Sequence, residues 1–284
     1  MTRTEVPAIG EPGRAAVELG AGRPTRFPGP ADHELSECRV PGASVRAASV
    51  RGLMHRYRDQ PRQDSFSVVW DEPTRTLVLA VCDGVGQFEL SQEAAAFAAL
   101  VTPRAYLAHR DWPTAFTEIN KRLAEFVAAP SGDALLGPAP ADARMATTLA
   151  AAAVRIGPDG RHASVAWTDD SSVWQLDDGR WWNLTPDPDA EPDSGLYTGR
   201  VKALPHADPR LRTAEHPLTE GPLFLMTDGV GVPLQGSAQV RETLAGWWAG
   251  PPDVFTFARQ VGFARKGHMD DRTAIGVWFE PESS

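Results

Sequence analysis

Short runs of apolar residues alternate with polar turns along the chain, and one of these runs covers residues 77–82. Its sequence, Leu-Val-Leu-Ala-Val-Cys, has no polar position, which is typical of a strand buried on both faces. Asp83-Gly84 follows directly, so a carboxylate stands at the rim of a core, where it needs a partner or a cation. Asp and Gly are also common in ordinary turns, so the other aspartates must decide between the two readings.

Helical spacing is clearest in residues 113–128. Phe116, Ile119, Leu123 and Phe126 stand three and four positions apart, which predicts a helix with one apolar face. Other helices are expected over residues 89–101, from Thr102-Pro103 onward, and over residues 252–264. Strands are expected over residues 45–57, 65–70, 76–82, 147–156, 163–167, 172–176, 180–184, 223–227 and 273–279.

The order of these elements bears on the fold class. Clustered strands interrupted by helices favour an α+β protein with largely antiparallel sheets. Residues 1–44 hold many Pro and Gly and no persistent period, so we expect an N-terminal extension, either partly disordered or lying over the domain. Residues 45–284 are then a single domain, and residues 130–142 and 185–208 are expected to be loops within it.

Composition narrows the class of protein. A formal net charge of −9 argues against a nucleic-acid-binding protein, because such proteins normally show a basic patch. Two cysteines, Cys38 and Cys82, do not make a disulfide framework, which favours a reducing, cytoplasmic compartment. No apolar run approaches the roughly 18 residues of a membrane span, and the N-terminus lacks the apolar segment of a signal peptide. We therefore expect neither nucleic acid nor membrane as a partner.

Aspartates stand beside several of the predicted strands. Four of them are Asp64, Asp83, Asp228 and Asp270, and the Asp169-Asp170 pair marks a fifth junction. If the sheets bring these strand ends together, the like charges repel and a cation is required. Oxygen ligands favour a hard ion, Mg²⁺ or Mn²⁺, over zinc. The seven histidines show no metal-ligand spacing such as H-x-x-x-H.

These motifs, taken in order, resemble those of the metal-dependent serine/threonine protein phosphatases of type 2C, the PPM family. The resemblance is strongest to compact bacterial members and covers roughly residues 45–284. It implies the family fold, a β-sandwich of two antiparallel sheets flanked by helices. The motifs that carry it are Asp64-Ser65-Phe66, Ala80-Val81-Cys82-Asp83-Gly84-Val85-Gly86, Ala146-Thr147-Thr148-Leu149, Thr168-Asp169-Asp170-Ser171, Phe224-Leu225-Met226-Thr227-Asp228-Gly229-Val230 and Asp270-Asp271-Arg272-Thr273.

The resemblance also implies a role for individual residues. Asp83 matches the carboxylate that bridges two metal ions, and Gly84 matches a glycine whose carbonyl binds one of them. The remaining metal carboxylates match Asp64, Asp228 and Asp270. Two Mn²⁺ or Mg²⁺ ions would activate a water for in-line hydrolysis of phosphoserine or phosphothreonine, without a phosphoenzyme. The implied partner is a phosphorylated protein, the substrate of a serine/threonine kinase.

The phosphate-binding arginine departs from the family pattern. In the family it stands five residues before the first aspartate, and here that place is Asp59. Arg58 is our candidate, with Arg62 and Arg56 behind it, because a planar guanidinium matches phosphate oxygens. The alternative is that all three are solvated loop charges.

A third metal ion is left open. Asp170 could serve one, but Val232 stands where its partner aspartate is expected. Asp271 stands where relatives often have Asn or Asp, so as a metal ligand it is a weaker candidate than Asp270. Besides an active phosphatase, the sequence thus admits a non-catalytic member that binds phosphoproteins as a regulatory module, or a metallohydrolase for small phosphate esters. The four retained metal carboxylates favour the active protein phosphatase.

Overall fold

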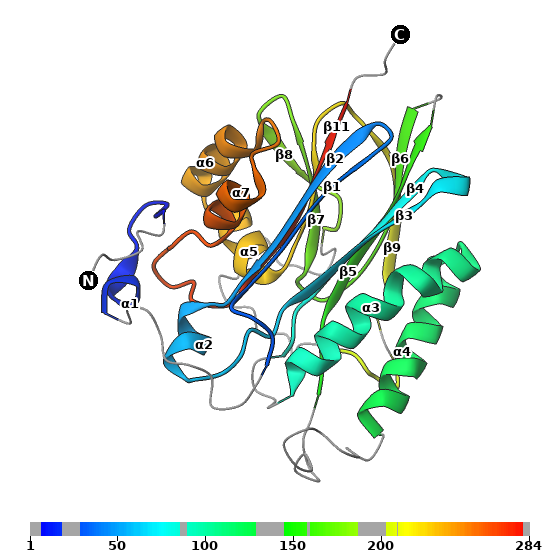
Figure 1. Ribbon diagram of the computed structural model, residues 1–284, viewed down its shortest axis with the longest axis horizontal. Helices are drawn as coiled ribbons and strands as arrows, with labels where there is room; N and C mark the ends of the chain where they lie inside the picture. Colours follow the sequence, from blue (N-terminus) through cyan, green and yellow to red (C-terminus); the bar gives the residue numbers. More distant parts are fainter. Residues whose placement is uncertain are drawn as a thin grey trace.

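The computed structural model describes residues 7–18, 29–85, 90–128, 145–157, 160–186, 203–208 and 210–280. Two antiparallel sheets face each other, and helices cover their outer sides (Figure 1). This confirms the predicted α+β sandwich. The loop predicted over residues 130–142 and most of the loop predicted over residues 185–208 lie outside the described residues. No helix among the described residues is both long enough and apolar enough to cross a membrane.

Each sheet joins strands that lie far apart in the sequence. The six-stranded sheet has the order β1 (His33–Val40), β2 (Ala43–Val50), β11 (Arg272–Phe279), β10 (Leu223–Met226), β7 (Ser172–Asp177) and β8 (Arg180–Asn183). The five-stranded sheet has the order β3 (Ser65–Asp71), β4 (Thr76–Cys82), β5 (Leu149–Gly157), β6 (Gly160–Thr168) and β9 (Arg212–Leu218). All these pairs are antiparallel, and a short 3₁₀ helix, η1 (Glu72–Thr74), connects β3 to β4.

Strand β4 confirms the prediction of a strand buried on both faces. All of its residues are buried, and alternate side chains point to opposite faces of the sheet. The side chains that enter the core between the sheets are Leu77, Leu79 and Val81. Those that enter the core beneath the helices are Val78, Ala80 and Cys82. The absence of polar positions in this run follows from these two cores.

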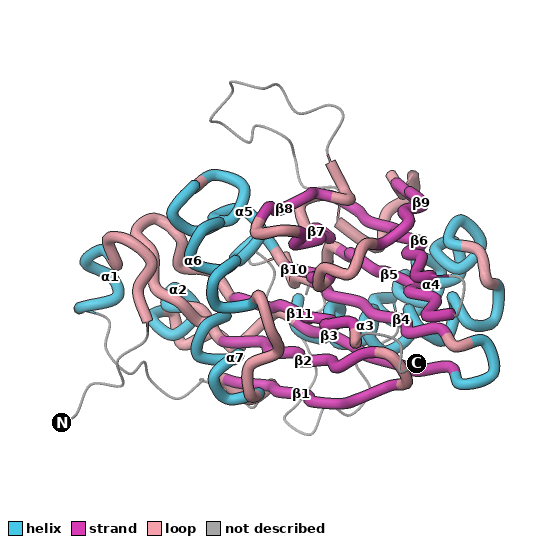
Figure 2. The backbone as a smooth tube through the Cα atoms, turned by 90° about the horizontal axis from the view of Figure 1, so that it is seen from above, coloured by secondary structure: helices cyan, strands magenta, loops and turns pink. Residues whose placement is uncertain are grey.

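The helices form the outer layers of the sandwich (Figures 1 and 2). On the five-stranded sheet lie α3 (Ser91–His109) and α4 (Trp112–Ala128), whose buried side chains share a core with β4 and β5. On the six-stranded sheet lie α5 (Asp228–Gly236), α6 (Ala238–Trp248) and α7 (Val254–Val261). Two short helices complete the described set, α1 (Gly13–Glu18) and α2 (Leu53–Tyr57).

Two predictions about individual elements were wrong. The strand expected over residues 45–57 ends at Val50, and the chain then forms α2. The new helix expected at Thr102-Pro103 is instead the middle of α3, which continues through Pro103. The Thr102 hydroxyl donates to the Ala98 carbonyl at 2.7 Å, and the alanine face of α3 is buried. Packing therefore outweighs the roughly 3 kcal/mol that an internal proline costs a helix.

The N-terminal region contains more structure than its composition indicated. Residues 33–40, expected to be irregular, form β1 and pair along their whole length with β2. Further back, Ile9 is buried, and its backbone N–H donates to the Ala264 carbonyl at 3.1 Å. Of the two readings of this region, the described part supports a segment that lies over the domain.

Candidate metal centre

The predicted aspartates gather at one end of the sandwich. Asp64 directly precedes β3 and Asp83 directly follows β4, and these strands pair so that Ser65 lies opposite Cys82. In the other sheet, Asp228 follows the end of β10 by one residue, and Asp270 comes shortly before β11, which pairs with β10 in the antiparallel sense. Antiparallel pairing thus places the ends that carry carboxylates beside each other within each sheet.

Asp64 connects the two sheets. Its side chain is buried, with only 2% of the residue exposed, and Oδ2 accepts hydrogen bonds from the hydroxyls of Thr227 (2.8 Å) and Thr273 (2.7 Å). Thr227 directly follows β10, and Thr273 is the second residue of β11, so both belong to the opposite side of the sandwich. Burial, followed by the charge of Asp271, raises the pKa of Asp64 to about 7, although the two hydroxyls oppose the shift.

Asp83 and Asp228 lie close enough in the cluster for the charge of Asp228 to act on Asp83. Burial and then the charge of Asp228 raise the pKa of Asp83 well above its ordinary value. Burial, then Asp270 and Asp64, raises the pKa of Asp228 to about 7. These carboxylates are therefore too close to carry their full charge without a cation.

Three buried carboxylate oxygens lack a hydrogen-bond partner within the described ranges, and two of them belong to this cluster. One is Oδ1 of Asp228, and the other is Oδ1 of Asp170, in the turn between β6 and β7. Burial, followed by the charge of Asp228, raises the pKa of Asp170 to about 7. A divalent cation would satisfy such oxygens, so the residues present fit a hard metal ion. Asp170 belongs to the same cluster, while a third metal ion stays an open prediction.

The backbone around Asp83 is held tightly. Its carbonyl accepts hydrogen bonds from the Thr147 hydroxyl (2.9 Å) and the Thr148 N–H (2.8 Å). A Cβ atom on Gly84 would lie only 2.8 Å from the Gln63 carbonyl oxygen, so a larger residue would push the two segments apart. Glycine at this position keeps Asp83 beside the start of β3. The metal-binding role of the Gly84 carbonyl stays a prediction.

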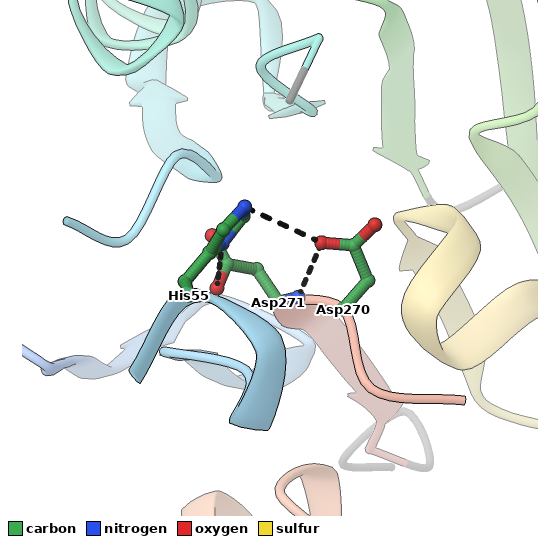
Figure 3. A group of neighbouring side chains, drawn as sticks. All are labelled: His55, Asp270 and Asp271. Atoms are coloured by element: carbon green, nitrogen blue, oxygen red, sulfur yellow. Dashed lines mark hydrogen bonds and ion pairs between the residues drawn. The ribbon is translucent and has the colours of Figure 1, made fainter. Parts of the chain in front are cut away.

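Asp270 and Asp271 are neighbours in sequence with opposite environments (Figure 3). Asp271 is 2% exposed and accepts hydrogen bonds from the backbone N–H groups of Gly52 (2.6 Å) and Gln63 (2.5 Å). The side chain of Asp270 is 54% exposed, and burial of its remainder, followed by the charge of Asp271, raises its pKa. The protein thus satisfies Asp271 by itself and leaves Asp270 open to the solvent side.

His55 is a functional candidate that the sequence reasoning missed. It lies in α2, with Nδ1 2.8 Å from Asp271 Oδ1 and Nε2 3.9 Å from Asp270 Oδ1 (Figure 3). Burial lowers the pKa of His55, but Asp271 together with Asp270 and Asp64 raises it more, so the net shift is upward. A search for paired histidines could not find it, because its partners are acidic and stand more than 200 residues later.

Arg272 was also missed and is a buried cation at the same site. Its Nη1 donates to the Gly229 carbonyl and its Nη2 to the His268 carbonyl at 2.9 Å, while its guanidinium lies 4.1 Å from the Phe263 ring centre. Burial lowers its pKa to about 10, against the opposing charges of Asp228 and Asp270. Arg272 therefore ties the start of α5, which carries Asp228, to the loop before β11, which carries Asp270.

The three candidate phosphate-binding arginines differ in burial and in hydrogen-bond partners. Arg62 is 2% exposed, and its Nη1 donates to the Asp64 carbonyl at 2.6 Å while its Nη2 pairs with Glu34. It positions the chain at Asp64 and does not reach solvent. Arg56 is half-buried, and its Nε has no hydrogen-bond partner among the described residues. Arg58 is exposed at the end of α2, so it stays our candidate.

A cleft of about 280 Å³ opens beside these groups. Its walls combine two of the carboxylates with apolar side chains from α2, α5 and the loop before β11. The lining residues are Met54, Asp228, Gly229, Val232, Gly267, His268, Met269 and Asp270.

Comparison with known proteins gives one family. Residues 51–254 match the family described as Protein phosphatase 2C. No curated protein matches the chain in sequence. Three similar solved structures are those of RsbX in complex with magnesium, the PPM Ser-Thr phosphatase MsPP from Mycobacterium smegmatis in complex with cacodylate, and the serine/threonine phosphatase PstP/Ppp from Mycobacterium tuberculosis.

These three structures share the fold with this chain at low sequence identity. RsbX is 14% identical with a TM-score of 0.53, over 87% of this chain and 100% of RsbX. MsPP is 20% identical with a TM-score of 0.54, over 84% of this chain and 98% of MsPP. PstP/Ppp is 18% identical with a TM-score of 0.55, over 84% of this chain and 100% of PstP/Ppp.

Proposed function

Because the chain belongs to the protein phosphatase 2C family, we propose that it is a metal-dependent phosphatase that hydrolyses phosphoserine and phosphothreonine on proteins. The observation that carries the proposal is the cluster of buried carboxylates around Asp83 and Asp228, whose pKa values are raised by burial and by one another. Perturbed groups of this kind beside a cleft are typical of functional sites. The structural similarity to solved serine/threonine phosphatases supports phosphoserine and phosphothreonine as the substrate class.

The proposed centre holds two Mn²⁺ or Mg²⁺ ions. Asp83 would bridge them, Asp228 and Asp270 would bind from the other sheet, and Asp64 and the Gly84 carbonyl would complete the set. The orphaned Oδ1 atom of Asp228 supports this assignment, as does the magnesium bound to RsbX. When bound, divalent cations activate a water molecule and stabilise negative charge on the attacking and leaving oxygens.

The chain's own residues position the substrate. Arg58, exposed beside the cleft-forming helix α2, would bind two phosphate oxygens through its planar guanidinium. Met54, Val232 and Met269 give the cleft an apolar wall, which would exclude water from one side of the phosphate ester. The hydroxyls of Thr227 and Thr273 keep Asp64 oriented towards the centre from behind. The physiological substrate would be a phosphoprotein made by a serine/threonine kinase.

The proposal can be tested with the full chain and two variants at opposite ends of one hairpin. Hydrolysis of p-nitrophenyl phosphate and of a phosphothreonine peptide would be measured with and without Mn²⁺. We expect metal-dependent turnover of both, a loss of about 100-fold or more in Asp83→Asn, and no loss in Asp71→Asn. Asp71 is a matched control because it belongs to β3 but faces the other end of the sheet.

Each other outcome points to a different conclusion. Turnover that survives in Asp83→Asn contradicts the site assignment. Binding of Mn²⁺ and of the phosphopeptide without turnover indicates the regulatory, phosphoprotein-binding alternative. Hydrolysis of the small ester alone indicates a hydrolase of small phosphate esters.

A further inference from the structure

His55 places a nitrogen donor among the carboxylates of the proposed centre. Its side chain is 6% exposed, and Figure 3 shows the ring pointing from α2 towards Asp270. Nε2 lies 3.9 Å from Asp270 Oδ1, which is beyond hydrogen-bond distance, and no hydrogen bond to Nε2 is formed in the part of the chain that the structure describes. Nε2 of His55 is therefore available as a metal ligand and faces the solvent-exposed carboxylate of Asp270.

The spacing of these two atoms suits a shared metal ion. Metal–nitrogen and metal–oxygen bonds of about 2.0–2.2 Å would place one ion between His55 Nε2 and Asp270 Oδ1. His55, Asp270 and Asp271 each have a possible ligand atom, and these atoms lie within 4.8 Å of one another. Asp270 Oδ1 accepts one backbone hydrogen bond, from the Asp271 N–H at 2.9 Å, and keeps a second lone pair for an ion. Asp271 instead accepts from the backbone N–H groups of Gly52 and Gln63 and faces His55 Nδ1.

Asp271 has a different part in this arrangement. A metal-bound histidine commonly turns its second ring nitrogen to a carboxylate, which fixes the tautomer and the plane of the ring. Here Nδ1 of His55 faces Asp271 at 2.8 Å, and Asp271 is itself fixed by the two backbone N–H groups. The ion-pair contact of Nδ1 with Asp271 lies on one side of the ring, and Nε2 on the other side faces Asp270.

We infer that His55 Nε2 and Asp270 together bind a divalent transition-metal ion, and that Asp271 orients the imidazole. The inference rests on the metal centre of the proposed function and adds a nitrogen ligand to it. An imidazole ligand suits transition metals, whereas Mg²⁺ takes oxygen ligands. His55 thus shifts the preference of the centre away from Mg²⁺ and towards first-row transition-metal ions, among which Mn²⁺ also accepts the surrounding oxygen ligands.

The experiment loads the full-length protein with Mn²⁺ and records electron spin echo envelope modulation, which detects a nitrogen bound to the ion. Calorimetry gives the dissociation constants of Mn²⁺ and Mg²⁺. We expect nitrogen coupling in the parent, its loss in His55→Ala and its retention in His268→Ala. His268 is the matched control because it lines the same cleft. In His55→Ala the dissociation constant of Mn²⁺ should rise about 10–100-fold, and that of Mg²⁺ much less.

The outcomes separate this inference from the proposed function. Tight Mn²⁺ binding without nitrogen coupling overturns the inference and leaves the carboxylate centre intact, with His55 contacting phosphate or solvent instead. Coupling that persists in His55→Ala also overturns it. Absence of any Mn²⁺ binding contradicts the metal centre itself. Labelling the histidines of the parent with ¹⁵N gives the same answer about nitrogen ligation without a variant, so a poorly folded His55→Ala leaves the test decisive.

Discussion

The two ends of the β3–β4 hairpin carry clefts with opposite electrostatics. At one end, Asp64 and Asp83 have raised pKa values because they are buried beside other carboxylates. At the other end, Asp71 has a lowered pKa because Thr74 and Arg110 donate hydrogen bonds to it. The cleft at that second end is the larger, about 430 Å³ against about 280 Å³.

Charge pairing, and not volume, distinguishes the end that we propose to bind metal. In the larger cleft, Arg110 pairs with Asp71 at 2.9 Å and His162 with Glu215 at 3.3 Å. Arg110 and Glu215 thus each have a polar partner within the protein. At the other end, the carboxylates repel one another, and the Asp228 Oδ1 atom has no partner among the described residues. Burial of uncompensated charge is energetically unfavourable, which supports the proposed binding of a cation at this end.

The largest effect on stability should come from Arg272, the buried cation at the proposed metal-binding end. Arg272→Met removes the donors to the Gly229 and His268 carbonyls and the positive charge beside Asp228 and Asp270. We expect a loss of about 3 kcal/mol or more in the free energy of unfolding of the metal-free protein. Urea denaturation measures it. A loss below about 1 kcal/mol would mean that Arg272 does not hold the start of α5 to the loop before β11.

Removing one of the repelling carboxylates should affect metal binding and stability in opposite directions. In Asp228→Asn, the amide can donate a hydrogen bond to Asp83 and carries no charge, so the metal-free protein should melt at a higher temperature at pH 8. The affinity for Mn²⁺ should fall by about 100-fold or more, because even the loss of a residue that only hydrogen-bonds to a metal ligand can cost that much. Differential scanning calorimetry and titration calorimetry measure the two quantities. A lower melting temperature would contradict the repulsion.

The same repulsion predicts a pH dependence. The carboxyl groups of Asp64, Asp170 and Asp228 have a pKa of about 7 in the folded protein, against an ordinary value of 3.8. The folded state then binds more protons than the unfolded state, so stability falls as pH rises from about 4 to 7. His55, whose pKa is also raised, contributes in the same direction.

The measurement is the urea midpoint of the metal-free protein between pH 4.5 and 8, repeated with saturating Mn²⁺. The metal competes with protons for the carboxylates, so it should remove most of the decline. Asp228→Asn is the control and should show a weaker decline than the parent. A midpoint that rises with pH in the metal-free parent would show that the carboxylates are not destabilised by their neighbours.

The comparison of the two ends also shows what the sequence could predict. Strand β4 was predicted correctly at both boundaries because both of its faces are buried, which leaves no polar position to blur the pattern. The edge strand β9 was missed because its side chains alternate between half-buried and exposed positions and it contains Pro217. The helices α5 and α6 were missed because glycines, and Pro233 in α5, interrupt their patterns.

The centre itself was predictable only in part. Asp64, Asp83, Asp228 and Asp270 stand at strand ends, so their positions could be derived from the strand pattern and a family resemblance. His55, Thr227, Thr273 and Arg272 act through contacts across the sandwich, with partners 40 to more than 200 residues away. Such contacts depend on how the two sheets meet, which no local pattern records.

The smallest expected effect is at the larger cleft. Arg110→Met breaks the pair with Asp71 and the hydrogen bond to Thr74, but both partners are near solvent. Exposed ion pairs of this kind contribute little to stability, so the free energy of unfolding should change only slightly, and the affinity for Mn²⁺ should not change. Urea denaturation and calorimetry check both. A clear loss of metal affinity would mean that the two ends of the hairpin are energetically coupled, and charge pairing would then no longer separate a functional end from a structural one.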